Sequence, residues 1–320
     1  MRIIYGKENY QHKNNKLFIA LGNFDGLHLA HRSIIRRACL LAQQNKEKSA
    51  VFLFDPHPVT KLYSRKDFLL ISSVKRRSEI LEELGVDFLI VEEFNEKIAS
   101  LSPFHFVVDY LVNTFRVGGV VVGFDYTFGN RGRGTAAHLL KWGEKFNFIV
   151  EVVPPVIIGD EVVSSSLIRE LLARGEVKNA AQYLGTNFKI SGLVVRGEGR
   201  GKILGFPTAN LQIQDGLLLP ANGVYLCSIA YGGKRHFALT NIGSKPTFHP
   251  GNAIVVEVYL IDFCGDLYGE ELTVEFLHRI RKEAVFSGAN SLKEQIHIDL
   301  KRAKELIQHE YSRMADNACR

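Results

Sequence analysis

Between residues 17 and 184, short apolar runs alternate with stretches whose apolar residues recur at helical spacing. Strands are predicted where the runs are almost wholly apolar, as in strands buried on both faces of a sheet, at 17–21, 49–54, 86–94 and 117–123. Helices are predicted between them and after them, at 31–45, 73–85, 102–115 and 164–185. This repeated strand–helix order predicts an α/β domain with a parallel sheet and right-handed crossovers, covering residues 1–184.

After Gly185 the pattern changes to short alternating strands that are separated by Gly and Asp turns. The stretch YGGKRH (231–236) is a hairpin signal, because two glycines between strands favour a tight two-residue turn. Several such strands in about 100 residues predict a small closed antiparallel β-barrel. An amphipathic helix is expected at 291–314. The second domain is therefore predicted at residues 185–320.

Composition describes an ordinary globular chain with a basic balance. The 320 residues are 46% hydrophobic and carry a formal net charge of +6. That charge favours anionic partners, either nucleic acid or phosphorylated small molecules. The scattered basic residues favour the small molecules, but charge alone does not decide between the two. No apolar run approaches membrane-spanning length, and the first residues lack the apolar core of a signal peptide. With four widely spaced cysteines, expected as free thiols, the sequence favours a cytoplasmic protein without membrane contact.

The stretch GNFDGLHLAHR (22–32) stands where the first strand leads into a helix. A helix N-terminus carries unpaired N–H groups and partial positive charge, so His28 and His31 at this end are placed to bind phosphates. Gly22 and Gly26 allow the backbone to come close to a ligand. The alternative is that the two histidines only cap the helix or are satisfied within the core.

Three further stretches of the first half carry polar residues that suit nucleotide chemistry. VVSSSLIRELL (162–172) places serines and an arginine at a helix start, although serine is also common there as a simple cap. FDPHP (54–58) follows a predicted strand. VVGFDYTFGNRGRGT (121–135) leads from a strand into a loop with four glycines and aromatic residues, suited to a flat ring. A plain glycine-rich loop is the alternative for this last stretch.

In the second half, RGEGRGKILGFPTANL (196–211) joins a glycine-rich turn, able to wrap phosphates with backbone N–H groups, to an extended segment. Thr208 and Asn210 point to the same side of that segment, because side chains alternate along a strand. Their oxygens suit Mg²⁺. Glu257 lies within the apolar strand IVVEVYL (254–260), where a carboxylate is costly unless paired or functional. Alternation alone leaves open that Glu257 simply faces outward.

Together, GNFDGLHLAH and SSSLIR resemble the H-x-G-H and serine-rich signatures of the nucleotidyltransferase superfamily. With FDPHP and GFDYTFG, the first half resembles the adenylyltransferase module of the bacterial bifunctional riboflavin kinase/FAD synthetase family, whose sheet is Rossmann-like. The resemblance implies that FMN attacks the α-phosphorus of ATP and gives FAD and pyrophosphate, assisted by Mg²⁺. By the same resemblance, ATP and its phosphates are bound by Gly22, Phe24, Asp25, Gly26, His28, His31, Ser164, Ser165 and Arg169. The flavin is expected beside Asp55, His57, Asp125 and Phe128.

The stretch GFPTAN closely resembles the riboflavin kinase signature, and the later strands resemble the rest of that barrel. This implies that Glu257 takes the proton of the riboflavin 5′-hydroxyl as that oxygen attacks the γ-phosphate of ATP. The resemblance assigns Mg²⁺ to Thr208 and Asn210. It assigns the ATP phosphates to Gly199, Gly201, Lys202, Pro207 and Thr208, and the flavin to Tyr268, Arg279 and Arg281.

Two positions depart from the family pattern. Ala30 replaces the glycine of H-x-G-H and adds a methyl where a ligand approaches, while Lys202 stands near a position that is usually arginine. The alternatives are therefore a riboflavin kinase with a weak or silent first domain, and a non-catalytic flavin- or RNA-binding regulator. A cytidylyltransferase fused to a barrel shares the histidine signature but leaves the second half unexplained. Self-association is left open.

Overall fold

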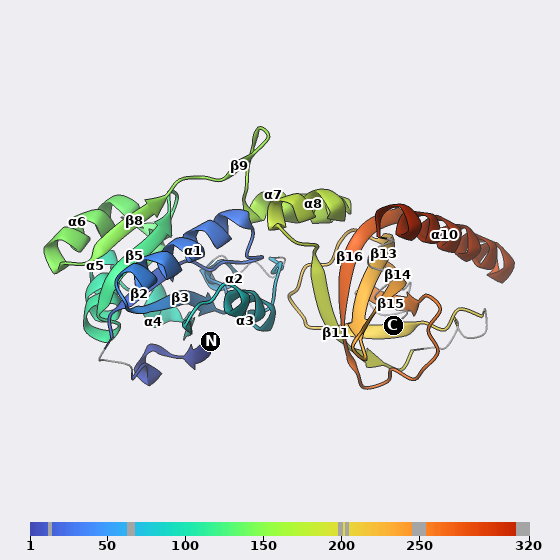
Figure 1. Cartoon of the computed structure of the whole chain (residues 1–320), viewed down its shortest axis with the longest axis horizontal. Coiled ribbons are helices and arrows are strands. Elements are labelled where there is room, and N and C mark those ends of the chain that lie inside the picture. Colours follow the sequence, from blue (N-terminus) through green and yellow to red (C-terminus); the bar gives the residue numbers. More distant parts are fainter. Residues whose placement is uncertain (12–14, 63–67, 198–200, 202–204, 245–253, 312–320) are drawn as a thin grey trace. The chain divides into compact units, whose positions relative to one another are not determined.

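The computed structural model describes residues 1–320 except 12–14, 63–67, 198–200, 202–204, 245–253 and 312–320 (Figure 1). Gly199 and Lys202 lie outside the described residues. The chain forms two compact units, Met1–Ser165 and Ser166–Arg320. The helical segment 166–184 thus belongs to the second compact unit, whereas the sequence places the functional boundary after it. The division at residues 184 and 185 remains a prediction of where the first functional module ends and the second begins.

The first unit is built on a parallel sheet with the strand order β1-β4-β3-β2-β5-β8. Its strands are β1 (Arg2–Tyr5), β2 (Leu17–Leu21), β3 (Lys48–Asp55), β4 (Phe88–Glu93), β5 (Val117–Gly123) and β8 (Ile149–Val153). All five residues of β2 are buried, because the strand lies in the middle of the sheet with side-chain layers on both faces. The predicted α/β class is confirmed, while β1 and β8 were not predicted.

Two apolar layers cover the faces of this sheet. One contains the buried sides of α1 (Leu29–Gln44) and α3 (Val74–Glu83). The other contains residues of α5 (Pro103–Phe106), its π-helical continuation η2 (Val107–Thr114), and α6 (Ala136–Phe146). Shorter elements connect them: η1 (Lys7–Asn9), α2 (Pro58–Leu62), α4 (Glu96–Ala99), β6 (Thr127–Phe128), η3 (Asn130–Gly132), β7 (Gly134–Thr135), β9 (Ile157–Ile158) and β10 (Glu161–Val162).

The second unit contains α7 from Ser166 onward, α8, a closed antiparallel barrel and a long final helix. The barrel order is β11-β12-β15-β14-β13-β16. The bounds are α7 (Ser165–Arg174), α8 (Val177–Leu184), β11 (Lys189–Val195), β12 (Ala209–Ile213), β13 (Gly223–Tyr231), β14 (Lys234–Ser244), β15 (Ile254–Leu260), β16 (Glu271–Lys282) and α10 (Ala289–Glu310). Tyr231 pairs with Lys234 across Gly232 and Gly233, both at positive φ, which confirms the predicted hairpin. Apolar residues of α10 pack on the outside of the barrel.

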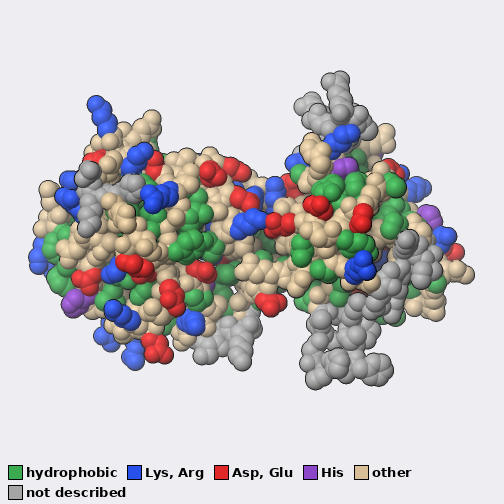
Figure 2. Space-filling view, turned by 90° about the horizontal axis from the view of Figure 1, so that it is seen from below, with side chains coloured by type: hydrophobic (Ala, Val, Ile, Leu, Met, Phe, Trp, Pro, Cys, Tyr) green, Lys and Arg blue, Asp and Glu red, His purple; other side chains and the backbone are tan. Residues whose placement is uncertain are grey.

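Charged side chains are distributed over the surface. On the face drawn in Figure 2, lysines and arginines are intermixed with acidic residues and do not form one basic patch. This agrees with the scattered basic residues of the sequence.

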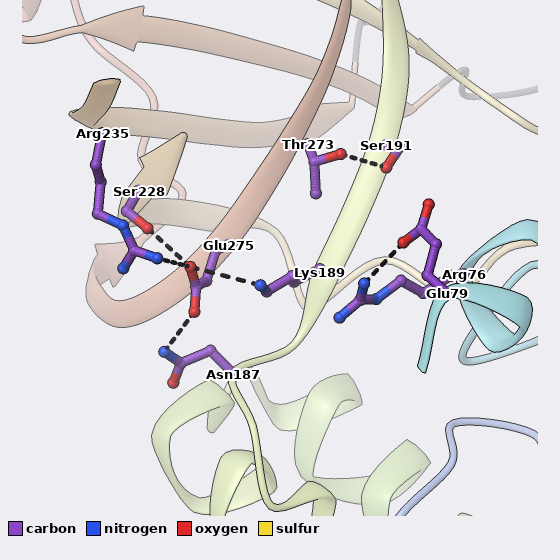
Figure 3. Close-up of polar contacts among 9 residues, drawn as sticks. All are labelled: Arg76, Glu79, Asn187, Lys189, Ser191, Ser228, Arg235, Thr273 and Glu275. Carbon is purple, nitrogen blue, oxygen red and sulfur yellow. Dashed lines mark hydrogen bonds and ion pairs between the residues drawn. The ribbon is translucent and has the colours of Figure 1, made fainter. Parts of the chain in front are cut away.

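A polar cluster at Glu275 fixes the chain where it enters the barrel (Figure 3). Glu275 on β16 accepts hydrogen bonds from Asn187 at 2.9 Å and Ser228 at 3.0 Å, and pairs with Lys189 and Arg235. Burial alone would raise the pKa of Glu275, but these donors and cations outweigh it and lower the pKa below its ordinary value. The carboxylate thus binds the segment before β11 to the barrel wall.

The two faces of α1 predict a clear difference between two truncations. Ile35 is fully buried against the sheet, whereas Leu40 is 41% exposed. We expect Ile35→Ala to lower the free energy of unfolding by about 2–4 kcal/mol, because it leaves a cavity. Leu40→Ala should change it by about 0.5 kcal/mol or less. Urea unfolding of the two variants measures this, and equal losses would contradict the packing described for α1.

Candidate functional site

The loop from Gly22 to His28 joins the end of β2 to α1 through an unusual backbone. Phe24, Gly26 and Leu27 have φ of 51°, 86° and 44°, all in the left-handed region. A Cβ on Gly26 would stand 2.9 Å from Cγ2 of Ile71, so glycine is required there both by conformation and by space. The loop is therefore tightly wound at the carboxyl end of a central strand.

His28 and His31 form a stacked pair at the start of α1. The ring centroids are 3.5 Å apart, and the backbone N–H of His31 donates to Nδ1 of His28 at 3.3 Å. Phe24 meets the His31 ring edge-on at 5.3 Å, and His28 is 3% exposed. His28 thus caps the helix, as expected under the alternative that the histidines serve only as helix caps. The cap also fixes both imidazoles beside the helix N-terminus, where anions are stabilised.

Asp25 joins three segments of the first unit. Its carboxylate is 2% exposed and accepts the N–H groups of Ile71 and Ser72, both at 3.1 Å. The Ser72 hydroxyl in turn accepts the N–H of Gly26 at 2.9 Å. The Ser165 hydroxyl donates to the Asp25 carbonyl at 3.0 Å. The histidine and serine motifs, far apart in sequence, therefore meet at Asp25, whose carboxylate is used to build the loop.

The predicted flavin residues of the first half have different environments. Asp55 ends β3 and Asp125 follows β5, both exposed, and the two strands flank β2 on either side. Their carboxyl ends therefore share the sheet edge that carries the histidine loop, where ligands bind in open α/β sheets. His57 accepts the N–H of Val59 on Nδ1 at 3.2 Å. Phe128 is buried in the core and stacks on Tyr126 at 5.7 Å, so it contributes packing.

Sequence reasoning missed Arg77 on α3. Arg77 is fully buried, and its Nη1 donates a hydrogen bond of 2.7 Å to the carbonyl of Asn23 in the loop from Gly22 to His28. The signal was available, because Arg77 stands at helical spacing from Val74, Ile80 and Leu81. An arginine on the apolar side of an amphipathic helix marks a buried charge.

The second unit contains a cavity of about 370 Å³ between the outer barrel surface and α10. Its lining includes Thr208, Asn210 and Glu257, together with Gly201 and Asn241. Asn210 on β12 lies opposite Glu257 on β15, and the Asn241 amide donates to Glu257 Oε2 at 3.4 Å. The strand register thus places an amide on each side of the carboxylate. Of the predicted kinase residues, Thr208, Asn210 and Glu257 come together in one place.

Glu257 was interpreted either as a functional carboxylate or as one that simply faces outward, and its orientation agrees with both. Val256 and Val258 are 1% and 0% exposed and fill the barrel interior, so Glu257 faces outward, as the alternative held. The outer surface at this point is covered by α10 and becomes the cavity wall. Glu257 therefore faces out of the barrel and also lines the cavity. The alternation of side chains along β15 could not show that α10 covers this part of the outer surface.

The predicted flavin residues of the second half differ in position. Arg281 lines the cavity, and its Nε donates to both carboxylate oxygens of Asp299 at 2.9 and 3.1 Å. Arg279 lies outside the lining and donates to the carbonyls of Arg174 and Asn222 at 2.7 and 2.6 Å. Tyr268 is 56% exposed and also lies outside the lining, as does exposed Pro207. Arg279 therefore binds the end of α7 to the barrel.

Among the described residues, no cluster of three or more His, Cys, Asp or Glu side chains could hold a metal ion. Besides the neutral oxygens of Thr208 and Asn210, the cavity lining contains the carboxylates of Glu257, Glu283 and Asp299, and the last of these pairs with Arg281. No helix in the described part of the chain has the length and apolar character needed to span a membrane.

Comparison with known proteins identifies both halves. Residues 10–167 match the family model of FAD synthetase, and residues 184–307 match that of riboflavin kinase. The bifunctional riboflavin kinase/FMN adenylyltransferase of Listeria monocytogenes is 36% identical, covering 88% of this chain and 89% of that protein. The enzyme of the same name from Escherichia coli K12 is 32% identical, covering 96% and 98%. A Streptococcus pneumoniae crystal structure named a macrolide-efflux protein has a TM-score of 0.86 at 31% identity, covering 95% of this chain and 99% of that one.

The bonds of Asp25 predict a stability effect. In Asp25→Ala the buried N–H groups of Ile71 and Ser72 lose their acceptor, so we expect a loss of about 2–4 kcal/mol in the free energy of unfolding. Asp160→Ala, at an exposed turn between β9 and β10, is the matched control and should change it by about 0.5 kcal/mol or less. Urea unfolding decides, and similar values for both variants would refute the joining role of Asp25.

Proposed function

The chain belongs to the bifunctional riboflavin kinase/FMN adenylyltransferase family, and on that basis we propose which residues perform its two reactions. The kinase reaction transfers the γ-phosphoryl group of ATP to riboflavin and gives FMN. The adenylyltransferase reaction transfers the adenylyl group of another ATP to FMN and gives FAD and pyrophosphate. The observation that carries the site assignment is the cavity where Thr208, Asn210 and Glu257 meet, within the region that matches riboflavin kinase.

In the kinase reaction, Glu257 acts as the general base. The 5′-hydroxyl oxygen of riboflavin attacks the γ-phosphorus, the bond from that phosphorus to the bridging oxygen of ADP breaks, and Glu257 takes the hydroxyl proton. The Asn241 amide holds Oε2 of Glu257, so one carboxylate oxygen is oriented before substrate binds. The apolar part of the cavity wall, including Phe206 and Leu239, suits the flavin ring.

The residues at this cavity fit a magnesium ion. Mg²⁺ prefers oxygen ligands and keeps several waters, so it needs only one or two protein ligands beside the substrate phosphates. Thr208, just before β12, and Asn210 within it line the same cavity and supply a hydroxyl and an amide oxygen. When bound, the ion would neutralise charge on the phosphates. The two side chains are accordingly proposed as its ligands.

In the adenylyltransferase reaction, an oxygen of the FMN phosphate attacks the α-phosphorus of ATP and the bond to pyrophosphate breaks. No protein nucleophile is needed, so catalysis consists of positioning and charge stabilisation. We assign the ATP phosphates to His28 and His31 at the N-terminus of α1, and the leaving pyrophosphate to Ser164, Ser165 and Arg169. Gly22, Phe24 and Gly26 shape the loop that the nucleotide approaches, and Asp25 holds that loop in place.

We further propose that the net positive charge serves ATP, FMN and FAD, without nucleic acid, and that the protein acts in the cytoplasm. The intermixed charges in Figure 2 support small anionic ligands over an extended polyanion. We also propose that the kinase module begins at residue 185, so that α7, which carries the serine motif at its start, serves the adenylyltransferase.

The first experiment separates the two activities. The purified chain receives ATP and Mg²⁺ with riboflavin in one tube and FMN in another, and the flavins are resolved by chromatography. We expect FAD from both tubes, which would also show that the methyl of Ala30 is tolerated. FMN from riboflavin with no FAD in either tube, even with reduced flavin, would leave a kinase with a silent first unit.

Point variants should separate the reactions further. Glu257→Gln removes the base, so we expect FMN formation to fall about 100-fold or more while FAD formation from FMN is unchanged. His28→Ala should do the reverse by a similar factor. Glu305→Gln, an exposed glutamate on α10, is the control and should leave both rates unchanged. Full kinase activity in Glu257→Gln would show that another group is the base.

The glycine-rich turn gives a steric prediction for the kinase. A Cβ on Gly197 would lie 2.1 Å from Nδ2 of Asn210, so Gly197→Ala must displace the proposed metal ligand. We expect kinase activity to fall about tenfold or more, with FAD formation from FMN unchanged. Gly288→Ala is the matched control, because nothing lies within 4 Å of its Cβ position. Unchanged kinase activity in Gly197→Ala would argue against the role of Asn210.

A further inference from the structure

Arg77 is a fully buried cation beneath the loop that carries the histidine motif. Its Nη1 donates to the Asn23 carbonyl at 2.7 Å. Nε and Nη2 are also buried, and neither has a hydrogen-bond partner among the described residues. The guanidinium thus uses one of its donors on the loop and leaves two donor groups unused inside the protein.

Stability alone does not account for this arrangement. A buried donor without an acceptor is destabilising, and a well-packed apolar side chain in place of a buried charge is often neutral or stabilising. The other buried residues of α3, Ile80 and Leu81, are apolar, as is expected of side chains that serve packing alone. A guanidinium retained in this position indicates a role for its charge.

Two carboxylates supply the opposing charge. Burial lowers the pKa of Arg77 below its ordinary value, and the charges of Asp25 and then Asp55 raise it again in part. Asp25 lies in the histidine loop, and Asp55 stands at the end of β3 on the same sheet edge. The hydrogen bond from Arg77 to the Asn23 carbonyl places the guanidinium beneath this same edge of the sheet.

This edge of the sheet must accept two polyanions. Resting on the function proposed above, ATP and FMN both bring phosphates to a site where the protein itself places carboxylates. Like charges repel, and the repulsion is stronger for the buried carboxylate of Asp25 than for that of the exposed Asp55, because burial lowers the effective dielectric constant. A cation behind the loop offsets the field of the carboxylates before the phosphates arrive.

We propose that Arg77 is a positioning residue of the adenylyltransferase reaction, which holds the Asn23 carbonyl and balances Asp25 and Asp55 so that the loop accepts the anionic substrates. It acts from behind the loop, through the backbone and through the field, and does not contact the reacting atoms. Its charge, more than its shape, is the property that matters.

The experiment compares Arg77→Lys, which keeps the charge, with Arg77→Gln, which keeps a donor for Asn23. Steady-state FAD formation from FMN is measured in the full-length chain with Mg²⁺, varying ATP and FMN in turn. For Arg77→Gln we expect KM for FMN and ATP to rise about tenfold, with a smaller change in kcat. Arg77→Lys should stay within about threefold of the parent chain.

A double-mutant cycle isolates the charge. If Arg77 compensates Asp55, then Arg77→Gln should raise KM for FMN by about threefold or less when Asp55→Asn is already present. If Arg77 served packing alone, Arg77→Gln would raise KM for FMN by the same factor with and without Asp55→Asn. Arg76→Gln is the matched control, because the preceding arginine forms a surface pair with Glu79 at 2.7 Å and should leave KM unchanged (Figure 3).

FMN formation from riboflavin in the same molecules should be unchanged, because that reaction belongs to the second unit. The proposal is overturned if Arg77→Lys and Arg77→Gln raise KM equally, or if the cycle shows no coupling with Asp55. Should Arg77→Gln not fold, Arg77→Lys still decides, since a tenfold rise in its KM would refute a role for charge. Failure of the parent chain to make FAD would instead refute the proposed adenylyltransferase function.

Discussion

The first unit depends on one buried carboxylate. Asp25 accepts backbone N–H groups from residues 71 and 72, and its own carbonyl accepts the Ser165 hydroxyl. Because the carboxylate is removed from water, these bonds must all be made together, which fixes the loop after β2 in a single conformation. The left-handed turn at Phe24 lies within this loop, and the stacked histidines follow it at the start of α1. The phosphate site proposed for this loop needs such rigidity before its substrates arrive.

The second unit obtains its site from a different constraint. A small barrel fills its interior with side chains, so it has no room for a ligand inside. The α10 helix covers part of the outer surface, and Arg281 and Asp299 tie it to β16 at the cavity wall. The outer faces of neighbouring strands then become a wall on which Asn210, Asn241 and Glu257 meet. The barrel strands set the spacing of these side chains, and α10 closes one side of the cavity.

Charge is handled differently at the two sites. At the barrel, a neutral amide holds Glu257 and the proposed metal ligands are neutral, while Arg281 and Asp299 form an ion pair in the cavity wall. At the sheet edge, the Asp25 carboxylate builds the loop, and the proposed phosphate contacts are histidines and a helix N-terminus. Arg77 belongs to this second strategy.

Both folds and most of the motifs could be predicted from the order of the amino acids. Apolar runs at 17–21 and 49–54 are buried strands because apolar layers cover both faces of the parallel sheet, and the glycine pair at 232–233 favours a tight turn. Which residues meet depends on the folded chain: Asp25 and Ser165 touch, Arg279 braces α7 while Arg281 lines the cavity, and outward-facing Glu257 lies in a pocket. Periodicity reports which face of its own element a residue occupies, but the element that covers that face comes from a distant part of the chain. Arg77 shows the same limit, because its position on the apolar side of a helix is a signal of a buried charge, and only the folded chain showed which carbonyl it contacts.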